Sequence, residues 1–142
     1  MKTNAGLREM LDGLGCGAPI RFSRIRFPYR AEGLCIPVLG VFIDEKYRAV
    51  PDPWLRAVVC HEVGHWRDPL VWVGAGAILA GVINVFLWLC APMAWPVAPL
   101  WSGVLIITAL VIAPWKERRA DAAARRLMPD YDEFDKPYPG EG

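Results

Sequence analysis

Two histidines and a glutamate, His61, Glu62 and His65, form a His-Glu-x-x-His pattern in the stretch Cys60-His61-Glu62-Val63-Gly64-His65-Trp66. Residues four apart lie on one face of a helix, so the two imidazoles can reach the same point in space. Two imidazoles that converge in this way are typical ligands of Zn²⁺. Glu62 is turned by about 100° from His61, so it can reach a water on the ion without being a ligand. The pattern therefore predicts a catalytic zinc site with Glu62 as the general base.

A catalytic zinc site needs a third protein ligand and an open coordination position. The chain has only two histidines, so the third ligand must be of another type. Glu117 and Asp121 are again four residues apart, and they follow a long apolar stretch. On a helix, Glu117 can face the metal while Asp121, one turn later, accepts a hydrogen bond from the ring N–H of a liganding histidine. We expect one Zn²⁺ ion bound by His61, His65 and Glu117, with Asp121 supporting a ligand.

The apolar stretch between the two motifs is long enough to cross a membrane twice. Of the 142 residues 54% are hydrophobic, and residues 69–115 contain no Asp, Glu, Lys, Arg or His. One crossing needs about 20 residues. We expect crossings at 70–90 and 100–115, joined by a proline-containing turn at 91–99. The net charge of +1 says nothing about nucleic acid, but no basic, aromatic patch argues for it, and we expect no nucleic-acid partner.

Basic residues predict the orientation of this hairpin. The turn at 91–99 is uncharged, whereas arginine and lysine residues flank the two ends near the motifs. The positive-inside rule then places the site and both termini in the cytoplasm of a two-pass protein of the cell inner membrane. No apolar signal segment follows Met1-Lys2, so insertion is expected to use the hairpin. Self-association of the hairpin is left open. The four cysteines show no C-x-x-C spacing and are expected to be reduced thiols.

A helix and two extended stretches are predicted before the metal helix, the helix that carries His61 and His65. Helical spacing predicts a helix over 4–14, and alternation predicts a strand over 20–27. A second extended stretch, 34–43, contains Pro37 and Gly40, which are typical of an edge or bulged strand. Such an edge can hold an extended peptide by main-chain hydrogen bonds, and an edge that pairs with nothing fits the pattern equally well. The residues expected to bind substrate in this way are Val38, Leu39, Gly40 and Val41.

Helix start signals divide the chain. Asp52 as N-cap and Pro53 as first residue begin the metal helix, which ends near Arg67, and Asp68-Pro69 repeats the signal for the first crossing. Pro114 is expected to kink or break the returning helix. The predicted parts are residues 1–68, the first half of a cytoplasmic catalytic domain; 69–115, the transmembrane hairpin; 116–129, the second motif helix; and 130–142, a flexible tail.

The paired motifs resemble a known family. His61-Glu62-Val63-Gly64-His65-Trp66-Arg67, followed by Glu117-Arg118-Arg119-Ala120-Asp121-Ala122, is similar to the integral-membrane gluzincin metallopeptidases, the HtpX-like and Ste24-like (CAAX prenyl protease) family. The resemblance covers about residues 34–126. It implies zinc ligation by His61, His65 and Glu117, with Glu62 as the base and Asp121 as the supporting residue. It also implies an α+β membrane protein in which a short sheet with an edge strand and the two motif helices form a small gluzincin-like domain, with one transmembrane hairpin inserted between those helices. The chain has no histidine to match the family's downstream transition-state group; the candidates for that role are Tyr131, Tyr138, Arg125, Arg126, Tyr47 and Tyr29.

Two functions of different classes follow. The first is a zinc metalloendopeptidase that hydrolyses peptide bonds in extended or unfolded protein segments near the cytoplasmic membrane face. The second is a non-catalytic, membrane-anchored adaptor in which zinc stabilises a small fold. A structural zinc site is normally closed by a fourth ligand, often cysteine. Cys60 is adjacent to His61 but lies about 100° off its helical face, which favours the open, catalytic form.

Overall fold

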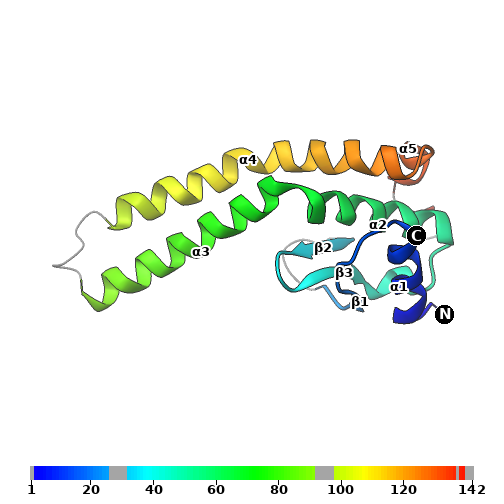
Figure 1. Cartoon of the computed structure of the whole chain (residues 1–142), viewed down its shortest axis with the longest axis horizontal. Helices are drawn as coiled ribbons and strands as arrows, with labels where there is room; N and C mark the ends of the chain where they lie inside the picture. The colour runs from blue at the N-terminus through cyan, green and yellow to red at the C-terminus, as the bar shows by residue number, and fades with distance from the viewer. Residues whose placement is uncertain (1, 26–31, 92–97, 137, 140–142) are drawn as a thin grey trace. The chain divides into compact units, whose positions relative to one another are not determined.

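The computed structural model describes residues 2–25, 32–91, 98–136 and 138–139. The chain divides into two compact units, one formed by Met1–Arg67 with Arg118–Gly142 and the other by Asp68–Glu117. The first unit is α+β and the second is a pair of helices. This is the coarse fold expected from the sequence, a small mixed unit interrupted by two long apolar helices (Figure 1).

A three-stranded sheet forms the base of the first unit. Its strands are β1 (Ile20–Ser23), β2 (Gly33–Ile36) and β3 (Gly40–Asp44), in the order β1-β3-β2. β3 pairs in parallel with β1 and antiparallel with β2. The single extended stretch expected over 34–43 is therefore wrong, because β2 and β3 form a hairpin. Pro37 and Val38 occupy the turn, which is closed by the Leu39 N–H donating to the Ile36 carbonyl at 3.1 Å.

The edge-strand assignment of Val38, Leu39, Gly40 and Val41 is also wrong. Val38 and Leu39 lie in the turn, and Val38 has a φ of 73°, which suits the third position of a type II turn after Pro37. Gly40 and Val41 begin β3, the central strand, where both sides are already paired. Pro37 marks a turn here and not an edge. Within the described residues, β2 is the edge strand that packs on the helix carrying His61 and His65.

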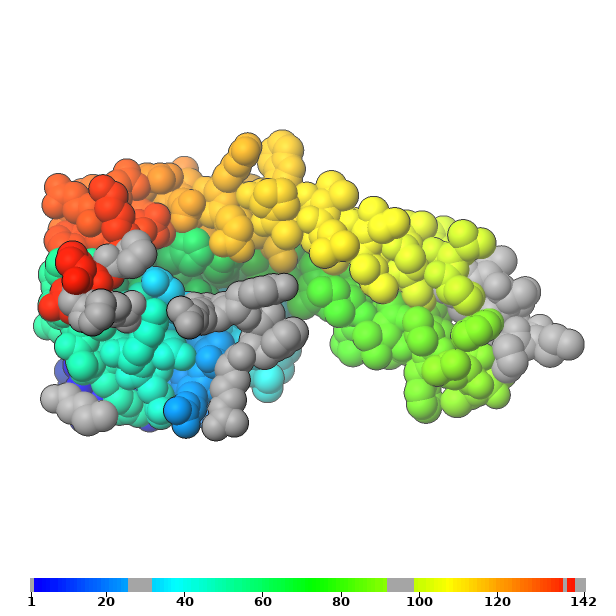
Figure 2. Space-filling view, turned by 180° about the vertical axis from the view of Figure 1, so that it is seen from behind, coloured from blue at the N-terminus to red at the C-terminus, as the bar shows by residue number. Residues whose placement is uncertain are grey.

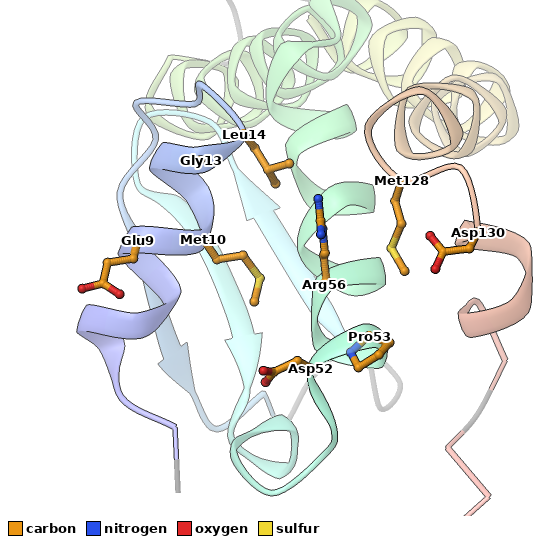
Figure 3. A pocket seen from close by; sticks show the side chains of 9 residues that line it. All are labelled: Glu9, Met10, Gly13, Leu14, Asp52, Pro53, Arg56, Met128 and Asp130. Atoms are coloured by element: carbon orange, nitrogen blue, oxygen red, sulfur yellow. The ribbon is translucent and has the colours of Figure 1, made fainter.

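Two helices cover one face of this sheet. α1 (Asn4–Gly13) packs on β1, and α2 (Asp52–Arg67) packs on β2 and β3 (Figures 1 and 3). A short 3-10 helix, η1 (Glu45–Arg48), leads from β3 toward α2. The core between helices and sheet is built from small and branched apolar side chains, among them Leu7, Leu11, Val41, Ile43, Leu55, Val59 and Val63. Burying this face holds α2 against the sheet.

The segment after the second motif helix is packed and not loose. It contains α5 (Tyr131–Phe134), and the Tyr131 side chain is 1% exposed. Phe134 and Tyr138 both make edge-to-face contacts with Trp54 of α2, at ring-centroid distances of 4.8 and 5.0 Å. The expected flexible tail at 130–142 is therefore wrong for the described residues 131–136 and 138–139. Aromatic residues every three to four positions anchor them to α2.

The second unit is a pair of long apolar helices. α3 (Pro69–Cys90) begins with Asp68 as N-cap, and α4 (Ala98–Leu127) supplies the returning helix. The Ser102 hydroxyl donates to the Gly81 carbonyl at 3.2 Å, so the two helices approach closely there. Gly74 also lies against α4, whereas Gly76 is exposed and has no such neighbour among the described residues. α4 runs through Pro114 without a break, which joins the second crossing and the second motif helix into one element.

Both helices are long and apolar enough to cross a membrane. The spans are Pro69–Cys90, with a mean hydropathy of 2.2, and Pro99–Leu127, with 1.5. Most of their large apolar side chains are exposed. The two helices form the green and yellow part of the surface in Figure 2. Contiguous apolar surface of this extent is rare on a protein surrounded by water, so a lipid environment accounts for it best.

Candidate metal centre

The two histidines lie in the C-terminal half of α2. His61 and His65 are one helical turn apart, and their rings are 4.7 Å apart between centroids with planes at 85°. Both are half-buried, whereas Glu62 between them is only 5% exposed. The helical spacing thus brings the imidazoles to one place while Glu62 turns toward the sheet.

Asp121 of α4 meets His61. The His61 Nδ1 and the Asp121 Oδ1 are 2.9 Å apart, so Nδ1–H donates to the carboxylate. A neutral imidazole carries one hydrogen, so a protonated Nδ1 leaves the lone pair of Nε2 available. Fixing the tautomer in this way is the usual second contact of a metal-binding histidine.

A glycine and two alanines let α4 approach α2 closely enough for this contact. A Cβ built on Gly64 would lie 2.8 Å from the Cα and carbonyl oxygen of Ala120, a separation that real side chains do not adopt. Ala120 and Ala124 are both fully buried. Small side chains at these three positions therefore set the distance between the two helices.

Glu117 lies on α4 one turn before Asp121, at the end of the second unit. His61, His65 and Glu117 each offer one ligand atom, and these three atoms lie within 4.8 Å of one another. Two donors on one tetrahedral Zn²⁺ are roughly 3.3 Å apart, so small side-chain rotations suffice to bring them onto an ion. Two imidazoles and a carboxylate are also the donor types of catalytic zinc sites. The three residues fit a divalent metal of this kind.

Glu62 packs directly on the outer strand. A Cβ built on Gly33 of β2 would lie 2.6 Å from the Glu62 Cγ and Oε1. Only a glycine leaves this space for the carboxylate. Cys35, two residues along β2, is partly buried, and burial raises the pKa of its thiol to about 12, with the Glu62 charge adding to the shift. The thiol next to Glu62 is therefore neutral and does not compete with it as a base.

Tyr131 makes contacts at the metal centre that its spacing in the sequence could not predict. Its hydroxyl lies 3.1 Å from His61 Nδ1, 3.1 Å from Asp121 Oδ1 and 2.8 Å from Asp135 Oδ1. Burial raises its pKa, and hydrogen bonding to Asp135 adds to this. The hydroxyl is held at Nδ1 of His61 by these contacts, and its role in stabilising an oxyanion stays a prediction. A single tyrosine ten residues after Asp121 carries no periodic signal that could reveal this contact.

The remaining oxyanion candidates lie elsewhere or outside the described residues. Tyr138 packs on Trp54, Tyr47 is buried in the core, and Arg125 pairs with Asp132 at 2.9 Å. Arg126 is exposed near the end of α4, and Tyr29 falls outside the described residues. Cys60, considered as a fourth ligand, is fully buried in an apolar cluster with Ala57, Ala124, Met128 and Tyr131.

A separate pocket of about 480 Å³ lies between α1, the first turns of α2 and the chain after α4. In Figure 3, Arg56 stands between Met10 on one side and Met128 and Asp130 on the other. Its lining contains none of the metal-centre residues. The pocket is therefore not where the histidines and Glu62 would meet a substrate.

Comparison of the chain with protein-family models, with curated proteins and with solved structures finds no match. The function must therefore be argued from the residues of the metal centre and from the helices that position them.

Proposed function

We propose that this chain is a membrane-bound zinc metalloendopeptidase that hydrolyses peptide bonds in extended or unfolded protein segments near the cytoplasmic membrane face. The observation that carries the proposal is the group of His61, His65 and Glu117, whose ligand atoms lie within 4.8 Å of one another. The contact from Asp121 to His61 Nδ1 adds the outer support that such ligands need. The resemblance of the two motifs to gluzincin peptidases agrees with this assignment.

His61, His65 and Glu117 would hold the Zn²⁺ ion, which would supply polarisation of the scissile carbonyl and acidification of a water molecule. Glu62 is the base in this proposal: its carboxylate accepts a proton as the water oxygen bonds to the carbonyl carbon. When the C–N bond breaks, Glu62 returns that proton to the departing amine nitrogen, so that peptide and water become an acid and an amine. Glu62 is buried beside His61, where its charge is poorly screened by solvent.

The outer strand β2 is the element best placed to hold a substrate. It packs on α2, and Gly33 in it contacts Glu62. An extended peptide that adds to β2 by main-chain hydrogen bonds would pass close to this carboxylate. Main-chain recognition also accepts varied side chains, as a peptidase acting on unfolded segments requires. β2 thus takes the role first assigned to Val38, Leu39, Gly40 and Val41.

The test compares the detergent-purified wild type with the Glu62→Gln variant, using zinc content and hydrolysis of unfolded casein. Glutamine keeps the size of the side chain but cannot accept the proton. We expect one zinc per chain in both proteins and cleavage by the wild type alone, with a rate loss of at least about 100-fold in the variant. Cleavage by both proteins would remove Glu62 from its role. Zinc in both without cleavage in either would favour the adaptor function.

A further inference from the structure

We infer that Tyr131 and Asp135 are positioning residues of the metal centre: together they keep the hydrogen of His61 on Nδ1 and so present Nε2 to the metal. This inference rests on the proposed function, which is the reason for expecting a metal at this site. The contacts that carry it lie entirely within the first unit. They come from the packed C-terminal segment, which we define as residues 128–136 and 138–139.

The first step is the competition for one hydrogen. The Tyr131 hydroxyl lies within hydrogen-bond distance of two carboxylates, Asp135 at 2.8 Å and Asp121 at 3.1 Å. A hydroxyl has a single hydrogen, and a carboxylate accepts it more strongly than an imidazole does. No hydroxyl hydrogen is then left for His61 Nδ1, although the two groups are 3.1 Å apart. Nδ1 must therefore be the donor in that contact.

The second step concerns the surroundings of Nδ1. Two oxygen acceptors face it, the Asp121 carboxylate at 2.9 Å and the Tyr131 hydroxyl at 3.1 Å. Both favour the Nδ1–H tautomer, and two contacts restrict the rotation of the ring more than one does. Asp121 alone could hold the hydrogen, but Tyr131 adds the second point that fixes the ring plane.

The third step is the rigidity of the hydroxyl itself. The Tyr131 side chain is 1% exposed and packs with Ala57, Cys60, Ala124 and Met128. Beyond it, Phe134 and Tyr138 hold the segment on Trp54. The ring cannot turn away without opening this cluster, so the hydroxyl is positioned before any metal binds. Preorganisation of this kind strengthens binding because less entropy is lost on complex formation.

The experiment uses Tyr131→Phe, which removes only the hydroxyl and keeps the buried ring. Tyr138→Phe is the matched control, because it removes a hydroxyl from the same segment without a contact to His61. Zinc dissociation constants are measured by competition with a chromophoric chelator. We expect Tyr131→Phe to weaken zinc binding about 10-fold, the low end of the loss typical of outer-shell partners, and Tyr138→Phe to leave it unchanged.

A second readout does not depend on metal or on activity. The chain has two histidines, so a long-range ¹H–¹⁵N spectrum of histidine-labelled, metal-free protein contains two imidazoles. We expect His61 to be in the Nδ1–H tautomer in the wild type, and to gain Nε2–H tautomer in Tyr131→Phe. Asp135→Asn, which changes an exposed side chain and leaves the core intact, should shift both readouts in the same direction.

The outcomes separate the two proposals. A wild type that binds no zinc overturns the proposed function, while the tautomer of the metal-free protein still tests the contacts of Tyr131. A wild type that binds zinc, with an unchanged dissociation constant and tautomer in Tyr131→Phe, overturns the inference alone. Weakened binding with a changed tautomer in Tyr131→Phe and Asp135→Asn, but not in Tyr138→Phe, supports it.

Discussion

The position of the Glu62 carboxylate depends on Gly33, a residue without a side chain. The space for its carboxylate exists because Gly33 lacks a Cβ, which would lie 2.6 Å from the Glu62 Oε1. The far end of a glutamate can rotate, so an added methyl group would move the carboxylate and leave α2 in place. Gly33 therefore controls the position of the Glu62 carboxylate and not the fold.

We predict that Gly33→Ala lowers kcat for peptide hydrolysis by about 100-fold, because a displacement of about 1 Å of a reacting group costs this much. Zinc content should stay at the wild-type level, since no ligand moves. Gly17→Ala is the control, because a Cβ at Gly17 would meet nothing within 4 Å. Steady-state kinetics and metal analysis of the three proteins check the prediction. An unchanged kcat in Gly33→Ala would contradict the role assigned to this close contact.

At the scale of elements, the contact between α2 and α4 determines whether the two motifs meet. The two helices approach each other closely at Gly64 and Ala120, and the Asp121 carboxylate that contacts His61 follows directly. Alanine favours a helix over glycine by about 1 kcal/mol, so propensity alone predicts that Gly64→Ala stabilises the protein. The added Cβ would meet backbone atoms, which cannot rotate away, so packing should outweigh propensity.

We therefore predict that Gly64→Ala lowers the free energy of unfolding by about 1–3 kcal/mol and weakens zinc binding. Gly6→Ala in α1 is the matched control, because its Cβ would have only an ordinary contact with Thr3. That control should gain up to about 1 kcal/mol from helix propensity. Chemical denaturation of the metal-free proteins, followed by zinc titration, gives both quantities. Equal stabilisation by the two substitutions would show that α4 does not constrain Gly64.

Short-range patterns could predict much of this fold, and tertiary contacts account for the rest. The spacing of His61 and His65, and the Asp68-Pro69 start signal, lie in helices that begin and end close to the expected residues. Pro37 could not be interpreted alone, because proline suits an edge strand and a type II turn equally well. Tyr131 could not be placed either, since its contacts depend on how the chain returns after α4. The sequence thus reveals periodic elements but not the packing of single side chains between them.

The whole molecule carries two kinds of surface in one chain. Apart from Val38 and Leu39, the exposed large apolar side chains of the described residues all lie in α3 and in the part of α4 up to Trp115. Two such helices of 22 and 29 residues match the length that a bilayer crossing requires. Basic residues near the motif ends and none in the turn then predict which side of the membrane carries the metal centre.

Cys90 at the end of α3 makes this orientation measurable. It is exposed, whereas Cys16 and Cys60 are buried and the partly buried Cys35 thiol has a pKa raised to about 12 by its burial. A thiol with a raised pKa has little thiolate near neutral pH, so its reaction with a maleimide is slow. Cys90 should therefore account for nearly all rapid labelling of the native chain.

We predict that a membrane-impermeant maleimide labels the chain in intact spheroplasts at pH 7 without lysis, because the turn after Cys90 is expected on the outer side. Cys90→Ala should lose this labelling, which identifies the reacting thiol. Mass spectrometry of the purified chain gives the modified position. Labelling that requires lysis would place the turn in the cytoplasm and the metal centre, if both helices cross, on the opposite side. In that case the substrates would be segments outside the cytoplasm, while the roles argued for His61, Glu62 and Tyr131 would stand unchanged.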